Sequence, residues 1–242
     1  MLREIRDLIT FFTIIPLGKG RIEGAAKYFF LSPLVVGGLV GGLSGLIGLL
    51  LSLSVKGFLP GMVALFTSFL LTGFHHLDGL MDFSDALMAH GSVENRVKAL
   101  HDKYPGSAAI ASAVLNISAS LMAVSKITGM DLLMAFIAAE IASRCAALTV
   151  LYLGPPASFS KLGLTFSKEI YGKHGRYSLG LFGPLIALYV VLRFKGVIMI
   201  LVSFLIGIIL DILANKTING VSGDVCGAAI EISRTATLLI FC

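Results

Sequence analysis

The chain has very little charge. Only 14% of its 242 residues are Asp, Glu, Lys or Arg, whereas 56% are hydrophobic, and its mean hydropathy is +0.92. Soluble domains average about 25% charged residues, so too few charges remain here to cover a water-soluble surface. The composition excludes a separate soluble domain and predicts one polytopic membrane domain over residues 1–242.

Cysteine is also scarce. Cys145, Cys226 and Cys242 lie in apolar segments without CxxC spacing, which favours small buried hydrophobic residues over a disulfide or a zinc site. The net charge of +5, in a chain of this kind, indicates cationic loops near anionic lipid and phosphorylated substrates. We therefore expect membrane lipid as a partner, and no nucleic acid.

The apolar runs predict an all-α integral membrane protein with about seven transmembrane helices, since a span needs about 20 residues. The predicted spans are 31–55, 61–78, 107–125, 132–153, 179–193, 197–213 and 225–242. Most Lys and Arg residues fall on one side of these spans, and the positive-inside rule assigns that side to the cytoplasm. The acidic residues at span ends gather on the same side, so we expect a multi-pass protein of the cytoplasmic membrane whose active site faces the cytoplasm.

Two features concern packing rather than chemistry. Apolar residues from Leu2 to Phe12 share one face of a predicted helix, which indicates an amphipathic helix lying in the membrane interface. Gly37, Gly41 and Gly45 recur every four residues in the first span, and such spacing lets two helices approach closely. That approach predicts either packing within the chain or the seam of a homodimer.

The sharpest motif is HHLDGLMDFSDALMAH, from His75 to His90. Asp78, Asp82 and Asp85 are spaced i, i+4 and i+7, so on a helix their carboxylates share one face. Like charges at these spacings repel each other, and a bound cation relieves the repulsion. Three carboxylates without thiolates suit a hard ion, Mg²⁺ or Mn²⁺. A solvated acidic helix end is the alternative, but carboxylates beside a span are costly and usually functional.

Two further constellations bear polar groups within or next to spans. Glu140 and Arg144 are an i, i+4 pair inside the fourth span; they either compensate each other or present the guanidinium to a phosphate. Near the end of the chain, Ser222 and Gly223 precede Asp224 in a flexible turn. Backbone N–H groups at such a turn can hold phosphate, while Asp224 either caps the helix or ligates a metal.

The chain resembles the cobalamin synthase family over nearly its whole length. The matching blocks are FFTIIP (11–16), HLDGLMDFSDAL (76–87), AEIASR (139–144) and NGVSGDVCGAAIE (219–231), in the order of the family. By this alignment the family's histidine is His76, although a regular helix would place His75 nearer the acidic face. We follow the alignment, because a chain entering at Asp78–Gly79 need not be regular helix. Ile14 and Tyr104 stand where the family usually has arginine.

The resemblance implies transfer of the cobinamide-phosphate group of adenosylcobinamide-GDP to α-ribazole or its 5′-phosphate, releasing GMP. As a hypothesis, Mg²⁺ (or Mn²⁺) is held by four aspartates, and the other roles fall on residues of the matching blocks. The expected metal ligands are Asp78, Asp82, Asp85 and Asp224, the catalytic residues His76, Asp82 and Asp85, and the substrate contacts Asp102, Arg144, Ser222 and Gly223.

Two other classes of protein share some of these features. A CDP-alcohol phosphatidyltransferase also places Asp-Gly and several aspartates at a helix end, but its motif has an Ala-Arg pair after Asp-Gly, whereas Leu80–Met81 follow here. An ion-coupled transporter would place carboxylates at the bilayer midplane on several spans. The clustering of acidic residues at one side argues for an enzyme.

Overall fold

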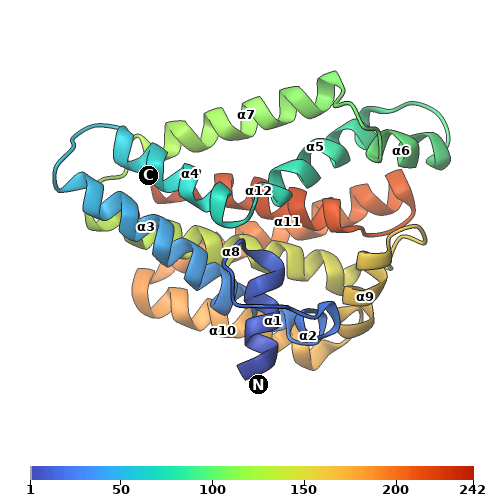
Figure 1. Cartoon of the computed structure of the whole chain (residues 1–242), viewed down its shortest axis with the longest axis horizontal. Helices are drawn as coiled ribbons and strands as arrows, with labels where there is room; N and C mark the ends of the chain where they lie inside the picture. The colour runs from blue at the N-terminus through green and yellow to red at the C-terminus, as the bar shows by residue number, and fades with distance from the viewer. Residues whose placement is uncertain (1) are drawn as a thin grey trace.

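The computed structural model describes residues 2–242. Over that range the regular secondary structure is helical, apart from an isolated bridge between Pro156 and Val221. The elements, drawn in Figure 1, are α1 (Leu2–Phe12), α2 (Ile22–Lys27), η1 (Phe29–Leu31), η2 (Pro33–Gly37), α3 (Gly38–Ser52), α4 (Leu59–Leu71), α5 (His75–Met88), α6 (Val93–Leu100), α7 (Ser107–Val124), α8 (Met130–Leu153), α9 (Lys161–Ile170), α10 (His174–Leu192), α11 (Phe194–Ile218) and α12 (Gly223–Phe241).

The predicted all-helical membrane fold is confirmed. Within the described range, five segments are long and apolar enough to cross a membrane: 33–52, formed by η2 and α3 together, and α7, α8, α10 and α11. The other two predicted spans correspond to α4, which has 13 residues, and to α12, which has 19 but carries three charged side chains. Five of the seven predicted spans thus coincide with helical segments of membrane-spanning length and composition.

One predicted span was wrong in its boundary. The segment 61–78 is not a single helix, because α4 ends at Leu71 and the chain reverses at Gly73 and Phe74, both with left-handed backbone angles (φ 61° and 60°). A new helix, α5, begins at His75 and continues regularly through Asp78. The chain is thus regular helix at Asp78–Gly79, so an irregular entry is not the reason for the preference of the alignment for His76.

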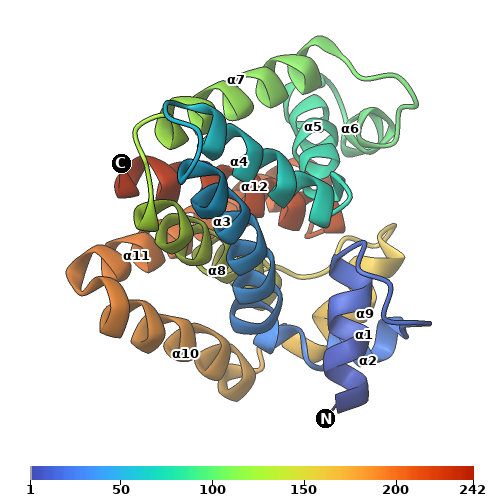
Figure 2. The ribbon, with the colours of Figure 1, turned by 60° about the vertical axis from the view of Figure 1, so that its left-hand side comes forward.

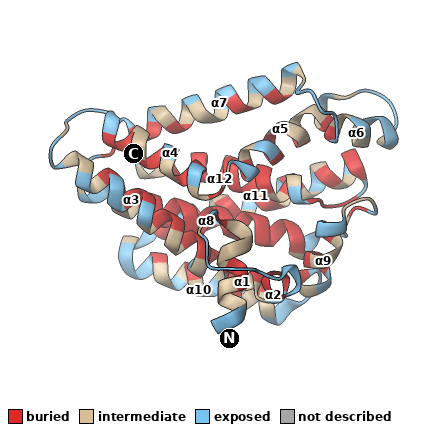
Figure 3. Ribbon diagram, in the orientation of Figure 1, coloured by how far each residue is buried: buried red, intermediate tan, exposed pale blue. Residues whose placement is uncertain are grey.

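Helix α8 forms the centre of the molecule and is buried along most of its length (Figure 3). It is surrounded by α3, α10, α11 and α12. The glycines that recur every four residues explain the contact of η2 and α3 with α8. A Cβ added at Gly37, Gly41 or Gly45 would lie less than 3 Å from backbone atoms of α8. These glycines therefore serve packing within the chain. Gly38 and Gly42 have open space around them, and the homodimer stays a prediction.

The amphipathic N-terminal helix is confirmed as α1, although its place in the membrane interface stays a prediction. It lies with α2 and α9 at one end of the molecule, away from α7 (Figure 2). Asp7 is fully buried on its inner face and accepts hydrogen bonds from Arg6 and Arg21, at 3.2 and 3.3 Å. These two arginines compensate the charge that the packing of α1 buries.

Candidate functional site

The acidic helix α5 packs against α12, and two glycines allow the close approach. A Cβ at Gly79 would lie 2.9 Å from the backbone oxygen of Asp224, and a Cβ at Gly227 would lie 3.0 Å from that of His76. Neither glycine was singled out from the sequence, although both lie inside the motifs. Their role is to bring the aspartates of α5 next to the start of α12.

Three aspartates define what we call the acidic cluster: Asp78 and Asp82 on α5, and Asp224 on α12. Burial, together with the negative charges of Asp78, Asp224 and Asp85, raises the pKa of Asp82 to about 7. None of the ion pairs found within residues 2–242 involves a member of the cluster. The cluster is therefore an uncompensated concentration of negative charge.

Asp85 has a different environment. One carboxylate oxygen accepts a hydrogen bond from the backbone N–H of Gly106 at 2.6 Å, and the other accepts one from Ala109 at 2.9 Å. These N–H groups belong to the first turn of α7, whose N-cap residue is a glycine without a side chain to cap it. Asp85 thus caps α7 from 21 residues away, a role that the sequence did not suggest.

The start of α12 matches the predicted turn. Asn219 and Gly220 have positive φ angles, 54° and 145°, and Ser222 precedes the helix as its N-cap residue. The Ser222 hydroxyl donates a hydrogen bond to the Asp224 carboxylate at 3.0 Å. Val221 is tied to the 155–157 segment by two backbone hydrogen bonds, with Pro155 and Ala157, so the turn is held in place.

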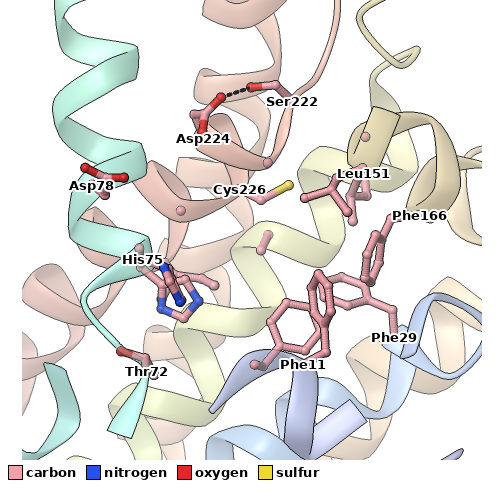
Figure 4. A pocket seen from close by; sticks show the side chains of 18 residues that line it. Phe11, Phe29, Thr72, His75, Asp78, Leu151, Phe166, Ser222, Asp224 and Cys226 are labelled. Carbon is pink, nitrogen blue, oxygen red and sulfur yellow. Dashed lines mark hydrogen bonds between the residues drawn. The ribbon is translucent and has the colours of Figure 1, made fainter. Parts of the chain in front are cut away.

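A cavity of about 380 Å³ opens beside the acidic cluster. Of the predicted site residues, it is lined by His76, Asp78, Ser222, Gly223 and Asp224. Figure 4 shows the side chains of Asp78 and Asp224 on one side of it and the rings of three phenylalanines on the other. The structure thus brings the two motifs, which are far apart in the sequence, together around one space.

His76 is almost fully buried, and its Nδ1 atom has no hydrogen-bond partner within the described residues. His75 also lines the cavity and is exposed. The helical-wheel preference for His75 and the alignment's preference for His76 are therefore both compatible with the cavity. The role of His76 as a catalytic residue stays a prediction.

Arg144 lies elsewhere, in a group that we call the buried ion network: Glu140, Arg144, Glu231 and Arg234. Arg234 contacts Glu140 at 2.6 Å and Glu231 at 2.5 Å, and Arg144 also pairs with Glu140. The network contains two positive and two negative side chains, each at most 2% exposed. Arg144 does not line the cavity, and within the network its charge has a compensating role.

Asp102 is likewise outside the cavity. It is exposed in the loop between α6 and α7, where its carboxylate accepts a hydrogen bond from the backbone N–H of Tyr104 at 3.0 Å. The cavity lining therefore does not include Asp102. Its contact with substrate stays a prediction.

The protein alone does not form a complete metal site. Within residues 2–242, no three or more His, Cys, Asp or Glu side chains are arranged so that they could hold a metal ion. The oxygen donors of the acidic cluster are nevertheless of the kind that Mg²⁺ takes, and Mg²⁺ is commonly bound by one or two carboxylates together with waters and substrate phosphates. The residues fit a metal only in that form, with substrate supplying further ligands.

The fold and the site define a polytopic helical membrane protein with an acidic cavity between packed helices. The family model for cobalamin-5-phosphate synthase matches residues 4–242, and the chain belongs to that family.

The chain is similar to proteins named adenosylcobinamide-GDP ribazoletransferase from three organisms. Identity is 32% with that of Sulfolobus acidocaldarius (99% of this chain, 92% of the relative), 33% with that of Saccharolobus solfataricus (96% and 88%) and 27% with that of Methanocella arvoryzae (98% and 94%). No solved structure matches. The chain is thus a transferase of cobalamin synthesis.

Proposed function

We propose that this protein transfers the cobinamide-phosphate group of adenosylcobinamide-GDP to α-ribazole or its 5′-phosphate, in a reaction that depends on Mg²⁺. The relatives' name, adenosylcobinamide-GDP ribazoletransferase, supplies the substrate classes. The observation that carries the chemistry is the acidic cluster, which borders a cavity of nucleoside size and has no compensating cation of its own.

In the proposed reaction, a ribose hydroxyl oxygen of the ribazole forms a bond to the phosphorus next to the cobinamide. The P–O bond of the pyrophosphate breaks, GMP leaves with the bonding electrons, and the hydroxyl proton passes to a base. Such a displacement depends on positioning and on neutralising the phosphate charges. A bound Mg²⁺ would supply that neutralisation.

The residues of this chain divide the remaining tasks. Asp78, Asp82 and Asp224 would hold the metal. Ser222, already bonded to Asp224 at 3.0 Å, fixes the orientation of that carboxylate, and Gly223 offers the exposed N–H groups at the start of α12 to a phosphate. His76 or an aspartate would accept the hydroxyl proton. Asp85 would support the site indirectly, because it caps α7, and would also have its predicted role as a catalytic residue and metal ligand.

The orientation also belongs to this proposal. By the positive-inside rule, the basic loops of the chain support a position of the acidic cluster on the cytoplasmic side of the cell membrane; among them is the segment with Arg96, Lys98 and Lys103, which follows α5. Phosphorylated substrates would reach the site from that side, attracted by the same cations.

The test uses purified full-length protein in nanodiscs with adenosylcobinamide-GDP, α-ribazole 5′-phosphate and Mg²⁺. We expect GMP and a matching corrinoid product in equal amounts, loss of both with EDTA, and recovery with excess Mg²⁺. Absence of product from folded protein would contradict the transfer, and full activity in EDTA would contradict the metal.

A further inference from the structure

The cavity beside the acidic cluster has an aromatic half that the proposed chemistry does not use. Phe11 and Phe12 of α1, Phe29 of η1 and Phe166 of α9 form what we call the aromatic wall. The Phe166 ring contacts the other three, with ring centroids 5.3 Å from Phe11, 5.7 Å from Phe12 and 5.4 Å from Phe29. Three separate elements thus converge on one ring, which lies against the cavity (Figure 4).

The half of the cavity near the wall has little that could form side-chain hydrogen bonds. Besides the four phenylalanines, Ala147, Leu151 and Leu162 border the cavity, and none of these seven side chains has a polar atom. The polar lining residues are Thr72 at the end of α4, His75, His76 and Asp78 of α5, and Ser222, Asp224 and Cys226 at the start of α12. An occupant should therefore be flat and apolar at one end and carry hydroxyl or phosphate groups at the other.

We propose that the aromatic wall binds the base of the ribazole, so that its ribose extends toward Asp78 and Asp224. This inference rests on the proposed function and adds the subsite of the acceptor. A benzimidazole is a flat, mostly apolar bicycle with a single acceptor nitrogen when its other nitrogen carries the ribose, and aromatic side chains bind such rings through their faces and edges. Its ribosyl group then carries the reacting hydroxyl to the acidic cluster.

Two other parts of the substrates fit the wall less well. The guanine of the GDP group has donors and acceptors along its edges, and burying them against phenylalanine and leucine would leave them unpaired, which is costly. The corrinoid macrocycle with its side chains is far larger than a cavity of about 380 Å³. The apolar base of the acceptor is the part that matches in both chemistry and size.

The test is the binding of α-ribazole and of GMP, each alone, to wild-type protein and to Phe166→Leu in nanodiscs, by equilibrium dialysis. Leucine keeps an apolar side chain and removes the ring. We expect the Kd for α-ribazole to rise about fivefold or more, with the Kd for GMP unchanged. Phe182→Leu is the matched control, because Phe182 is 56% exposed on α10 and does not line the cavity; both affinities should stay at the wild-type value.

The opposite pattern, weakened GMP with unchanged α-ribazole, would assign the wall to guanine and overturn the inference, and so would two unchanged affinities. If Phe166→Leu does not fold, Phe11→Leu on the half-buried end of α1 replaces it. A wild-type protein that binds α-ribazole but forms no GMP from both substrates would contradict the proposed function alone. Turnover with unchanged α-ribazole affinity in the variants would contradict only the subsite.

Discussion

Two groups of charged side chains lie among the packed helices, and they are opposite in design. The buried ion network holds two glutamates and two arginines of α8 and α12, linked by ion pairs and each at most 2% exposed. The acidic cluster holds three aspartates and no cation, next to a cavity. Every charged side chain of the network contacts one of opposite charge, whereas no ion pair found among residues 2–242 involves the cluster. The two groups therefore differ in charge balance, and only the cluster needs a cation from outside the protein in the function that we propose.

The network illustrates how polar groups are tolerated inside a membrane protein. Glu140 accepts hydrogen bonds from Ser68 at 2.5 Å and from Arg234 at 2.6 Å, and it also pairs with Arg144. Glu140 and Arg234 each pair with one ion on their own helix and with each other between α8 and α12, whereas Arg144 and Glu231 each pair within their own helix. Such a group links α4, α8 and α12, and breaking it leaves a buried charge without a partner.

The largest expected effect comes from neutralising the acidic cluster. Asp82→Asn should lower turnover by at least about 100-fold, because the variant loses a carboxylate that we propose as a metal ligand. Its thermal stability should stay at or above that of the wild type, since one repulsive charge is removed. GMP release and thermal unfolding in the same detergent measure the two effects.

Asp131→Asn is the matched control for that variant, because Asp131 is an exposed carboxylate in the first turn of α8 and should leave both quantities unchanged. Wild-type turnover in Asp82→Asn would remove Asp82 from the metal site.

The second effect should have the opposite character. Glu140→Leu leaves two buried arginines with only one glutamate, and we expect a loss of stability of about 3–5 kcal/mol. The double variant Glu140→Leu/Arg144→Met restores the balance of charge and should recover most of that loss. Unfolding in detergent, followed by circular dichroism, provides the comparison; a double variant as unstable as the single one would show that charge balance is not what matters here.

The two groups of charged side chains could be predicted from the sequence only in part. The positions of the helices follow from apolar runs, and the shared face of Asp78, Asp82 and Asp85 follows from helical periodicity. The i, i+4 spacing also identified the pair of Glu140 and Arg144. No local pattern indicates, however, that Arg234 joins that pair from 94 residues away, because such a contact depends on how α8 and α12 pack.

The same limit applies to Asp85 and to the reversal before α5. Periodicity placed Asp85 with the other aspartates, but its partners are the backbone N–H groups of Gly106 and Ala109, which only tertiary structure brings near. The turn at Gly73 and Phe74 lies within a continuous apolar run, so hydropathy alone extended the span across it. Hydropathy reports burial and not the direction of the chain.

The third prediction concerns Asp85, which has features of both groups. Asp85→Asn keeps one acceptor oxygen and loses the charge, so it should weaken the cap of α7 by about 1 kcal/mol. Hydrogen exchange of the amides of Gly106 and Ala109 should be faster in Asp85→Asn than in the wild type. It should be faster still in Asp85→Ala, which has no acceptor oxygen. Unchanged exchange combined with lost turnover would return Asp85 to a purely catalytic or metal-binding role.

The smallest expected effect is a pH dependence of stability in the absence of metal. The pKa of Asp82 is raised to about 7 in the folded protein, above the value of about 4 in an unfolded chain. The folded state therefore binds the proton more tightly, and the stability that Asp82 contributes is fully present below about pH 4 and is lost as the pH rises through about 7. The effect is small because the carboxyl group is only partly buried and water screens it.

In EDTA, the wild type should unfold at a lower temperature at pH 8 than at pH 6, and Asp82→Asn should lose most of that difference. Excess Mg²⁺ should reduce the difference in the wild type alone, because the ion compensates the charges that the protein leaves unpaired; an equal pH dependence in both proteins would locate the titrating group elsewhere.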